Sequence, residues 1–315
     1  MPCQVALIIL AAIMVTAGAR AETTNLNDLL GGLESGEAEM APQPAPEPAG
    51  VEPATTQQGD FRVGRRKVEK AVALVVAMLV DGKGRVVDRV PIGTAWAFEP
   101  TKLATNAHVV KGLVDIQEAV RKKGGDAIGF VAPNLGNGAA TKILGAKIHP
   151  RYDDMSPDLG GRVPAAPTYD LGILEVEEPM PATVTLADEA VLHQLESGTP
   201  VAYLGFPMEN LQGGNVDPQH PIATMQTGIV QAITDWYLKD GGFERNQLIR
   251  HSLPAAGGAS GSPIFTADGT VVAVLNAGNV VLVRPDPDSA ETIRIGTGAD
   301  INFAQRIDLL AGVPR

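Results

Sequence analysis

The chain has 315 residues, of which 44% are hydrophobic and 19% charged, with 35 glycines and 24 prolines. This composition excludes a wholly disordered chain and fits a globular protein with many short strands and turns. The formal net charge of −11 argues against nucleic acid or an anionic membrane surface as a partner.

Residues 1–21 predict a secretory signal peptide. An apolar run over residues 5–17 is followed by Ala19-Arg20-Ala21, a small-x-small cleavage pattern. The run is short for a membrane span, although no Lys or Arg precedes it, and an uncleaved anchor is the alternative. We expect an exported protein, periplasmic or extracellular, with no stable membrane span once the signal is removed. The single cysteine, Cys3, lies in this signal, so a mature chain would form no disulfide.

Residues 22–60 predict an acidic, disordered linker. The segment contains eight Asp or Glu residues and no Lys or Arg, and residues 41–48 alternate Pro with other residues. Proline at this density favours an extended, solvated chain. A short apolar patch at residues 26–33 could instead form one turn of amphipathic helix.

Residues 61–315 read as the folded part of the chain. Short apolar or alternating runs, separated by Asp-Gly and Asn-Gly turns, predict strands at 72–80, 86–98, 101–105, 142–148, 170–176, 200–206, 222–233, 247–253, 262–266, 270–276 and 300–304. Helical patterns are few and lie at 113–123, 187–196 and 305–311. Many short strands with few helices indicate an all-β sandwich or barrel.

The first segment with catalytic potential is residues 103–110, LATNAHVV, in which His108 follows a strand-like run. A histidine in such a place is more commonly structural than catalytic. The second segment is residues 169–176, YDLGILEV, in which Asp170 opens an apolar strand. A buried carboxylate is costly unless it is paired or hydrogen-bonded, and a turn or capping role is the alternative.

The third segment is residues 257–265, GGASGSPIF. Glycines on both sides of Ser260 allow an unusual turn, which could direct the N–H groups of Gly258 and Ser260 at one point. A developing oxyanion needs such donors, each worth about 3–4 kcal/mol of barrier. A glycine-rich surface turn is the alternative.

Together the three segments are more specific than each alone. A hydroxyl nucleophile, an imidazole base and an orienting carboxylate form a catalytic triad, here in the chain order His108, Asp170, Ser260. An α/β-hydrolase would have the order Ser, Asp, His and a G-x-S-x-G motif, whereas residue 262 is Ser.

These motifs resemble those of trypsin-like serine peptidases, in particular the protease domain of bacterial HtrA-type enzymes. The segments that carry the resemblance are TNAHVV at 105–110, HPRY at 149–152, DLGIL at 170–174, TGIV at 227–230, GASGSP at 258–263 and NFA at 302–304. Together they span roughly residues 65–312 and occur in the family's order.

The resemblance implies two packed six-stranded antiparallel β-barrels of the chymotrypsin-like fold, with a short C-terminal helix. The first barrel would cover about 61–178 and the second about 199–312, with the site in the cleft between them. It implies a serine endopeptidase that acts on protein or peptide substrates with the triad His108, Asp170 and Ser260, and with an oxyanion hole at Gly258 and Ser260. No cofactor or metal is implied. The alternative is a catalytically silent protease-fold binding protein.

Three departures from the family pattern carry consequences. Residue 259 is Ala where trypsin-like zymogens have Asp, so activation by a newly cut N-terminus is not expected. The separation of 62 positions from His108 to Asp170 is longer than usual, and residues 150–168 predict a long loop near the cleft. The chain ends at Arg315, so we expect no PDZ module after the protease domain.

The resemblance implies that the floor of the primary specificity pocket lies at Pro254, six residues before Ser260. The pocket wall would come from the strand after the serine, at Leu275, Asn276 and Ala277. An Asp at the floor would favour cleavage after Lys or Arg, and a His on the strand would favour Glu, and both are missing. We therefore expect a small or apolar residue before the scissile bond.

The other histidines have no zinc-site spacing. His251 lies nine residues before Ser260 and could reach the pocket, whereas His149, His193 and His220 are scattered. The acidic residues Asp153, Asp154 and Asp158 lack the pattern of a dedicated calcium loop, so a solvated loop is expected.

Overall fold

The computed structural model describes residues 60–136, 139–154, 165–208, 216–277, 280–283, 293–296 and 301–315, with side chains described outside 277–300. The predicted signal peptide and all but the last residue of the predicted linker lie outside this part of the chain.

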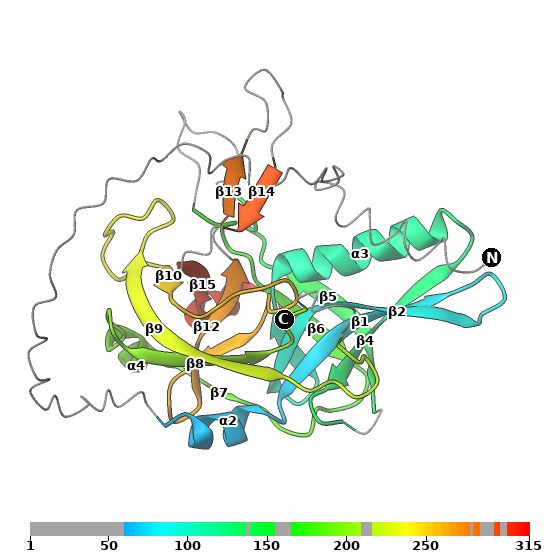
Figure 1. Ribbon diagram of the computed structural model, residues 1–315, viewed down its shortest axis with the longest axis horizontal. Coiled ribbons are helices and arrows are strands. Elements are labelled where there is room, and N and C mark those ends of the chain that lie inside the picture. Colours follow the sequence, from blue (N-terminus) through cyan, green and yellow to red (C-terminus); the bar gives the residue numbers. More distant parts are fainter. Residues whose placement is uncertain are drawn as a thin grey trace, which may run out of the picture.

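The first six strands close into an antiparallel barrel, shown on the right of Figure 1. In the order in which they pair around this first barrel, the strands are β1 (Val72–Val80), β2 (Val86–Glu99), β3 (Lys102–Thr105), β6 (Gly172–Val176), β5 (Thr141–Ile148) and β4 (Asp126–Pro133). The continuous apolar run of β1 follows from burial on both faces. Ala73 and Val75 pack within the barrel, whereas Leu74 and Val76 join a core cluster shared with the second barrel.

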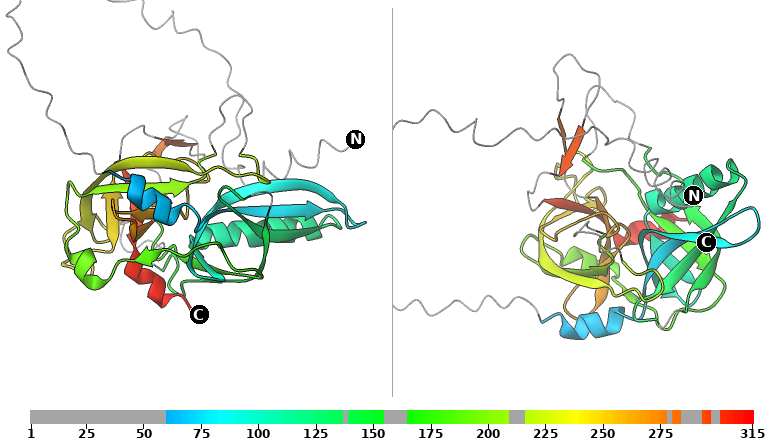
Figure 2. Two further views of the ribbon diagram at one scale, coloured as in Figure 1. Left: turned by 90° about the horizontal axis from the view of Figure 1, so that it is seen from below. Right: turned by 45° about the vertical axis from the view of Figure 1, so that its right-hand side comes forward.

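The second barrel lies beside the first (Figure 2). Its strands pair in the order β11 (Pro263–Phe265), β8 (Pro200–Gly205), β9 (Thr224–Thr234), β10 (Leu248–His251), β15 (Asn302–Arg306) and β12 (Thr270–Ala277). Pairing of β11 with β12 closes the barrel, and β7 (Thr185–Leu186) adds to β12 in parallel. A separate hairpin joins β13 (Val280–Val283) and β14 (Ile293–Gly296). The two six-stranded antiparallel barrels confirm the predicted chymotrypsin-like architecture.

Strand β4 was missing from the strands expected from sequence, yet it closes the first barrel. Its sequence contains Gly129 and ends at Pro133, and both residues weaken a strand pattern. Gly129 is required by a close approach, because a Cβ there would meet the Leu113 side chain at 2.7 Å. The glycine that obscured the strand therefore lets helix α3 (Ala107–Arg121) pack on the barrel.

Helix α3 begins six residues earlier than the predicted helix at 113–123, and this places His108 in its first turn. Its buried side chains include Val109, Leu113, Ile116 and Val120, which recur at the three- and four-residue spacing of one helix face. The preceding Asn106 is extended, with φ −84° and ψ 152°, so the helix starts directly after β3.

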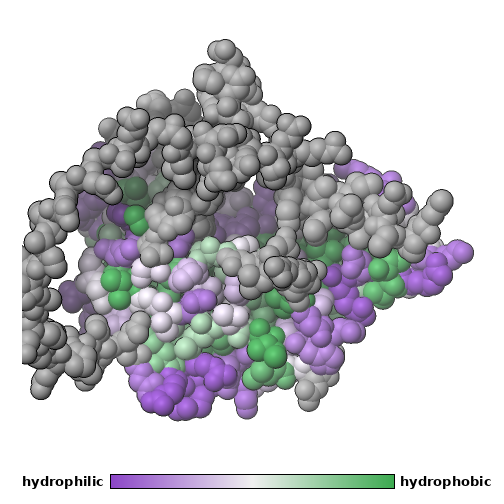
Figure 3. All heavy atoms as spheres, in the orientation of Figure 1, coloured by the Kyte–Doolittle hydropathy of each residue, from purple (hydrophilic) through white to green (hydrophobic). Residues whose placement is uncertain are grey.

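Three shorter helices complete the described fold. These are α2 (Arg62–Val68), α4 (Glu189–His193) and the 3₁₀ helix η2 (Ile307–Gly312), which lies at the predicted C-terminal helix. Helix α2 was not expected from the sequence, because it contains Gly64 and has no side-chain cap. Its exposed basic side chains form the hydrophilic lower edge in Figure 3. Among the described residues, none of the helices has both the length and the apolar character needed to cross a membrane.

His251 predicts a pH dependence of stability. Its imidazole, at the end of β10, is fully buried, and neither ring nitrogen has a hydrogen-bond partner among the described residues. Burial lowers its pKa to about 4, although the nearby backbone of Phe303 and Leu253 favours the protonated form. Folding therefore favours the neutral ring. Its contribution to stability is complete above the unfolded pKa and declines as the pH falls from 6.5 towards 4.

We expect the free energy of unfolding to fall in that window by about 1.4 kcal/mol per pH unit through this one group. Urea titrations followed by tryptophan fluorescence, at pH values from 7.5 to 4.5, measure it. His251→Gln should lose this slope, whereas His220→Gln, at an exposed histidine, should keep it. Equal slopes in wild type and His251→Gln would show that His251 does not titrate as described.

Candidate active site

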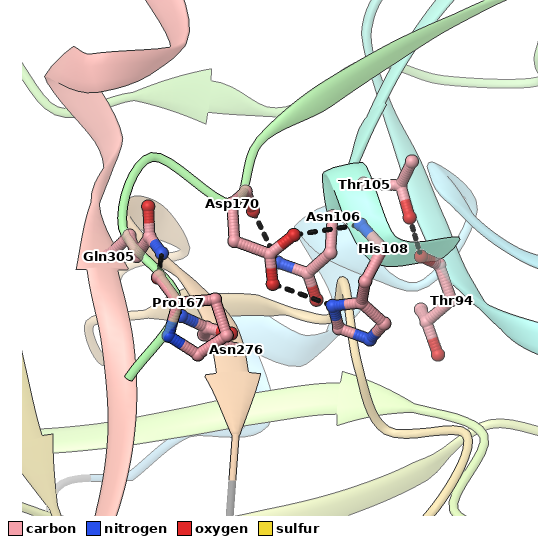
Figure 4. A network of polar contacts seen from close by, with 8 residues as sticks. All are labelled: Thr94, Thr105, Asn106, His108, Pro167, Asp170, Asn276 and Gln305. Atoms are coloured by element: carbon pink, nitrogen blue, oxygen red, sulfur yellow. Dashed lines mark hydrogen bonds and ion pairs between the residues drawn. The ribbon is translucent and has the colours of Figure 1, made fainter. Parts of the chain in front are cut away.

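Asp170 and His108 form a hydrogen-bonded pair at the junction of β6 and α3 (Figure 4). The Asp170 Oδ2 atom lies 2.6 Å from His108 Nδ1, and Asp170 Oδ1 accepts a hydrogen bond of 2.8 Å from the His108 backbone N–H. The carboxylate side chain has no exposed surface, whereas 39% of the His108 side chain is exposed. One edge of the imidazole is therefore held from inside the protein while another part faces solvent.

The backbone around Asp170 is held from several sides. Asn106 Nδ2 donates to the Asp170 carbonyl at 2.8 Å, and the His149 N–H donates to the Leu171 carbonyl at 2.8 Å. Tyr169 has a positive φ of 51°, which is uncommon for a non-glycine residue. Its ring stacks on His149 at 4.8 Å between centroids. This backbone turn directs the carboxylate towards α3.

The charge of Asp170 raises the pKa of two neighbouring side chains. Burial lowers the pKa of His108, but the negative charge of Asp170 and its hydrogen bond outweigh this effect, and the net pKa is raised. Burial and the same negative charge raise the pKa of Tyr152 to about 12. The Tyr152 hydroxyl therefore stays protonated at neutral pH.

Ser260 lies in the loop between β10 and β11. The Ala259 N–H donates to the Ala256 carbonyl at 3.1 Å, and Gly258 has a φ of 85°. A positive φ at the third residue of such a turn is typical of type II geometry. The turn ends at Ala259, directly before Ser260, and the N–H of the following Gly261 donates to the Leu275 carbonyl at 2.9 Å.

This loop is hydrogen-bonded to the first barrel. The Thr94 N–H donates to the Ser260 carbonyl at 2.9 Å, and the Thr94 hydroxyl donates to the Gly258 carbonyl at 2.9 Å. Trp96 Nε1 donates to the Gly261 carbonyl at 3.0 Å. Strand β2 thereby positions the loop of the second barrel against the start of α3.

The structure places Ser260 close to the segment that precedes His108. A Cβ at Gly261 would touch the Thr105 hydroxyl and the Asn106 backbone nitrogen. Two hydrogen bonds, from its backbone N–H and from its ring, join His108 to Asp170, and among the described residues none joins the ring to the Ser260 hydroxyl. Ser260 is partly exposed.

The expected pocket residues lie on two segments. Leu275 and Asn276 are buried on β12, beside the Ser260 loop, and Asn276 Nδ2 donates to the Pro167 carbonyl at 3.2 Å. Ala277 ends β12, and its side chain lies outside the described set. Pro254 is exposed on the loop after β10.

The remaining histidines occupy separate places. His149 is buried, and burial together with the nearby Arg151 charge lowers its pKa. His193 stacks on Phe243, and His220 lies 3.2 Å from Asp217. Among the described residues, no three His, Cys, Asp or Glu side chains are grouped as metal ligands would be. Asp158 of the expected acidic loop lies outside those residues.

Sequence reasoning missed the residues that hold the site together. Thr94 lies in the strand expected at 86–98 and Asn106 lies in the TNAHVV segment, but neither was assigned a role. Pro167 and Gln305 were not singled out. Asn106 could have been suspected, because a polar amide between an apolar strand and a helix start commonly makes backbone contacts.

Comparison with known proteins gives a family. Residues 93–274 match the family described as trypsin-like peptidase domain. The HtrA-type protease AlgW with a decapeptide superposes at a TM-score of 0.47 and 17% identity, over 80% of this chain and 65% of AlgW.

Two other solved structures give similar values. The Rv3671c protease in its inactive form has a TM-score of 0.46 at 17% identity, over 86% of this chain and 96% of that protein. The serine endoprotease from Yersinia pestis has 0.46 at 15% identity, over 80% and 64%. The chain thus spans less than two thirds of the length of AlgW. No curated protein matches it.

The glycines of the Ser260 loop predict a graded response to alanine. A Cβ at Gly261 would collide with the Thr94 carbonyl and the Thr105 hydroxyl at a φ of 86°, whereas a Cβ at Gly257 would meet nothing within 4 Å. Gly261→Ala should therefore lower the free energy of unfolding by about 2 kcal/mol or more, through overpacking and backbone strain.

Gly257→Ala is the matched control and should change stability by no more than about 0.5 kcal/mol. Denaturant unfolding of both variants measures the difference. Similar values for the two would contradict the close packing of Gly261 against β2 and β3.

Proposed function

The chain belongs to the family of trypsin-like peptidase domains, and from this premise we propose that it is a serine endopeptidase with the triad His108, Asp170 and Ser260. The observation that carries the proposal is the pairing of the buried Asp170 with His108, in which both carboxylate oxygens bind one histidine residue. A buried carboxylate held in this way fixes the orientation and the tautomer of an imidazole.

In the proposed reaction the Ser260 hydroxyl attacks the peptide carbonyl. His108 Nε2 takes the hydroxyl proton and later delivers it to the leaving amine, while Nδ1–H stays on Asp170. Water then attacks the acyl-enzyme by the same route and releases the acid. The Gly258 and Ser260 N–H groups would bind the oxyanion, and the turn with Gly258 at φ 85° supports this assignment.

We propose protein or peptide substrates with a small or apolar residue before the scissile bond. Structures of AlgW contain a decapeptide and a tripeptide, in keeping with peptide binding by this fold. The absence of an acidic residue at the expected pocket positions supports the residue preference. We also propose export, on the evidence of residues 1–21, and N-terminal sequencing of the mature protein near Glu22 tests it.

The pH profile should report the Asp170–His108 pair. The base form of His108 must be neutral, so kcat/KM should rise with pH as His108 loses its proton. Because Asp170 raises the pKa of His108 on balance, the midpoint of this rise should lie above 6.5. Asp170→Asn should lower the midpoint and reduce kcat by about 10⁴-fold, since it removes the charge and the tautomer control. An unchanged midpoint in Asp170→Asn would contradict the pairing.

The second candidate is a protease-fold binding protein without turnover. The described residues favour it in one respect, because no hydrogen bond joins Ser260 to His108. Catalytic hydrogen bonds are often absent before substrate binds, so this observation does not outweigh the Asp170–His108 pair.

Fluorophosphonate labelling separates the two functions. The enzyme should be labelled at Ser260 and should cleave a fluorogenic peptide library after small or apolar residues. Ser260→Ala should remove the label and lower kcat by about a million-fold. Ser252→Ala is the matched control. Ser252 directly follows β10, and its hydroxyl accepts a hydrogen bond from the Ile229 N–H. If folded wild-type protein neither reacts with the fluorophosphonate nor cleaves the peptides, the binding-protein function is supported. A preference for cleavage after Arg or Glu would refute the pocket assignment.

A further inference from the structure

One backbone carbonyl of the Asp170 segment is bound by two amide side chains of the second barrel (Figure 4). Gln305 Nε2 donates to the Pro167 carbonyl at 2.7 Å, and Asn276 Nδ2 donates to the same oxygen at 3.2 Å. The two amides come from neighbouring strands, since β12 pairs with β15 and Val274 is opposite Gln305. We call this arrangement the Pro167 clamp.

The clamp is costly as a packing element. Gln305 has no exposed surface and Asn276 is 2% exposed. The amide oxygens of both residues have no hydrogen-bond partner in the described part of the chain. A buried polar group without a partner costs about 1–3 kcal/mol, and an apolar side chain of similar size would avoid that cost. These two side chains therefore contribute through their N–H groups, which donate to the Pro167 carbonyl.

The clamp is connected to Asp170 by a short, constrained segment. Asp170 lies three positions after Pro167, with two residues between them, and three such steps span about 10 Å at most. Within this span the Thr168 carbonyl accepts from the Asp153 N–H at 2.8 Å, and Tyr169 has the positive φ described above. At the other end, Asn106 of the first barrel holds the Asp170 carbonyl. A displacement of Pro167 would therefore move the carboxylate relative to His108.

Strand β12 also supports the serine loop. Its Leu275 carbonyl accepts from the Gly261 N–H, and the Leu275 N–H donates to the Ser262 carbonyl at 2.9 Å. The next residue along β12 is Asn276. One strand of the second barrel thus holds both the loop that carries Ser260 and the segment that carries Asp170.

We propose that Gln305, assisted by Asn276, is a positioning residue of this site: by holding the Pro167 carbonyl, it sets the place at which Asp170 presents its carboxylate to His108. The catalytic consequence rests on the proposed peptidase function, whereas the placement of Asp170 against His108 does not.

The test removes the donors and follows His108 directly. Gln305→Met keeps the length of the side chain and loses its N–H groups. In the Ser260→Ala background, ¹⁵N-histidine NMR measures the pKa of His108 and the signal of its Nδ1 proton without any need for turnover. Loss of the clamp should lower the His108 pKa towards that of the Asp170→Asn protein, and should broaden or shift the Nδ1 proton signal.

In the protein with Ser260, Gln305→Met should reduce kcat by about 10- to 100-fold with little change in KM, since a misplacement of about 1 Å can have that effect. Asn276→Leu should act in the same direction, and keeps the test informative if Gln305→Met does not fold.

Asn134→Leu is the matched control. Asn134 is also buried and donates to the Glu69 carbonyl at 2.9 Å while accepting from the Ala223 N–H at 2.8 Å, without contacting the Asp170 segment. It should lower stability and leave the His108 pKa unchanged. If the clamp variants behave like Asn134→Leu, with lower stability but an unchanged His108 pKa, the clamp is only structural and the proposal is wrong. If His108 shifts in a protein that has no wild-type turnover, the positioning role stands and the peptidase function fails.

Discussion

The carboxylate of Asp170 is fully buried, and the rest of the site depends on how its charge is accommodated. Removing a carboxylate from water costs several kcal/mol unless hydrogen bonds replace the water. Here the first turn of α3 supplies two donors from a single residue, the backbone N–H and the ring of His108. The start of α3 at Ala107 is therefore a condition for the pair, because a helix that began later would not present both donors together.

The two barrels hold each other's site segments. The Ser260 loop belongs to the second barrel but is hydrogen-bonded to Thr94 and Trp96 on β2 of the first. The Asp170 segment belongs to the first barrel but is hydrogen-bonded to Asn276 and Gln305 of the second. A sliding motion of one barrel against the other would strain both sets of contacts. This crossed attachment restrains the two barrels relative to each other, as a site that takes residues from both of them would require.

The sequence predicted the two-barrel architecture, because the patterns of apolar and polar residues that mark strands are local. The proposed triad was also chosen from local motifs, since reactive side chains can be recognised by residue type, and it stays a prediction. The prediction of elements missed β4, since the glycine that admits Leu113 also weakens the strand pattern, and it started α3 too late, since Ala107 and His108 add little to the helical periodicity. The Pro167 clamp could not be predicted. Its acceptor is a backbone carbonyl, which every residue has, and its donors lie more than 100 residues away in the chain.

Among the described residues, some of the buried polar atoms without partners lie close to the proposed triad or in the clamp, whereas others, such as the His251 ring nitrogens, lie elsewhere. The first group includes Asn106 Oδ1, Thr168 Oγ1 and Ser262 Oγ, together with the amide oxygens of the clamp. Each lowers stability relative to an apolar replacement, and each belongs to a side chain within two residues of the proposed triad or in the clamp. A fold selected for stability alone would remove them. Such polar groups are retained where they hold another residue in position. The contacts that fix Asp170 and Ser260 therefore lower the stability of the fold while they set the geometry of these two residues.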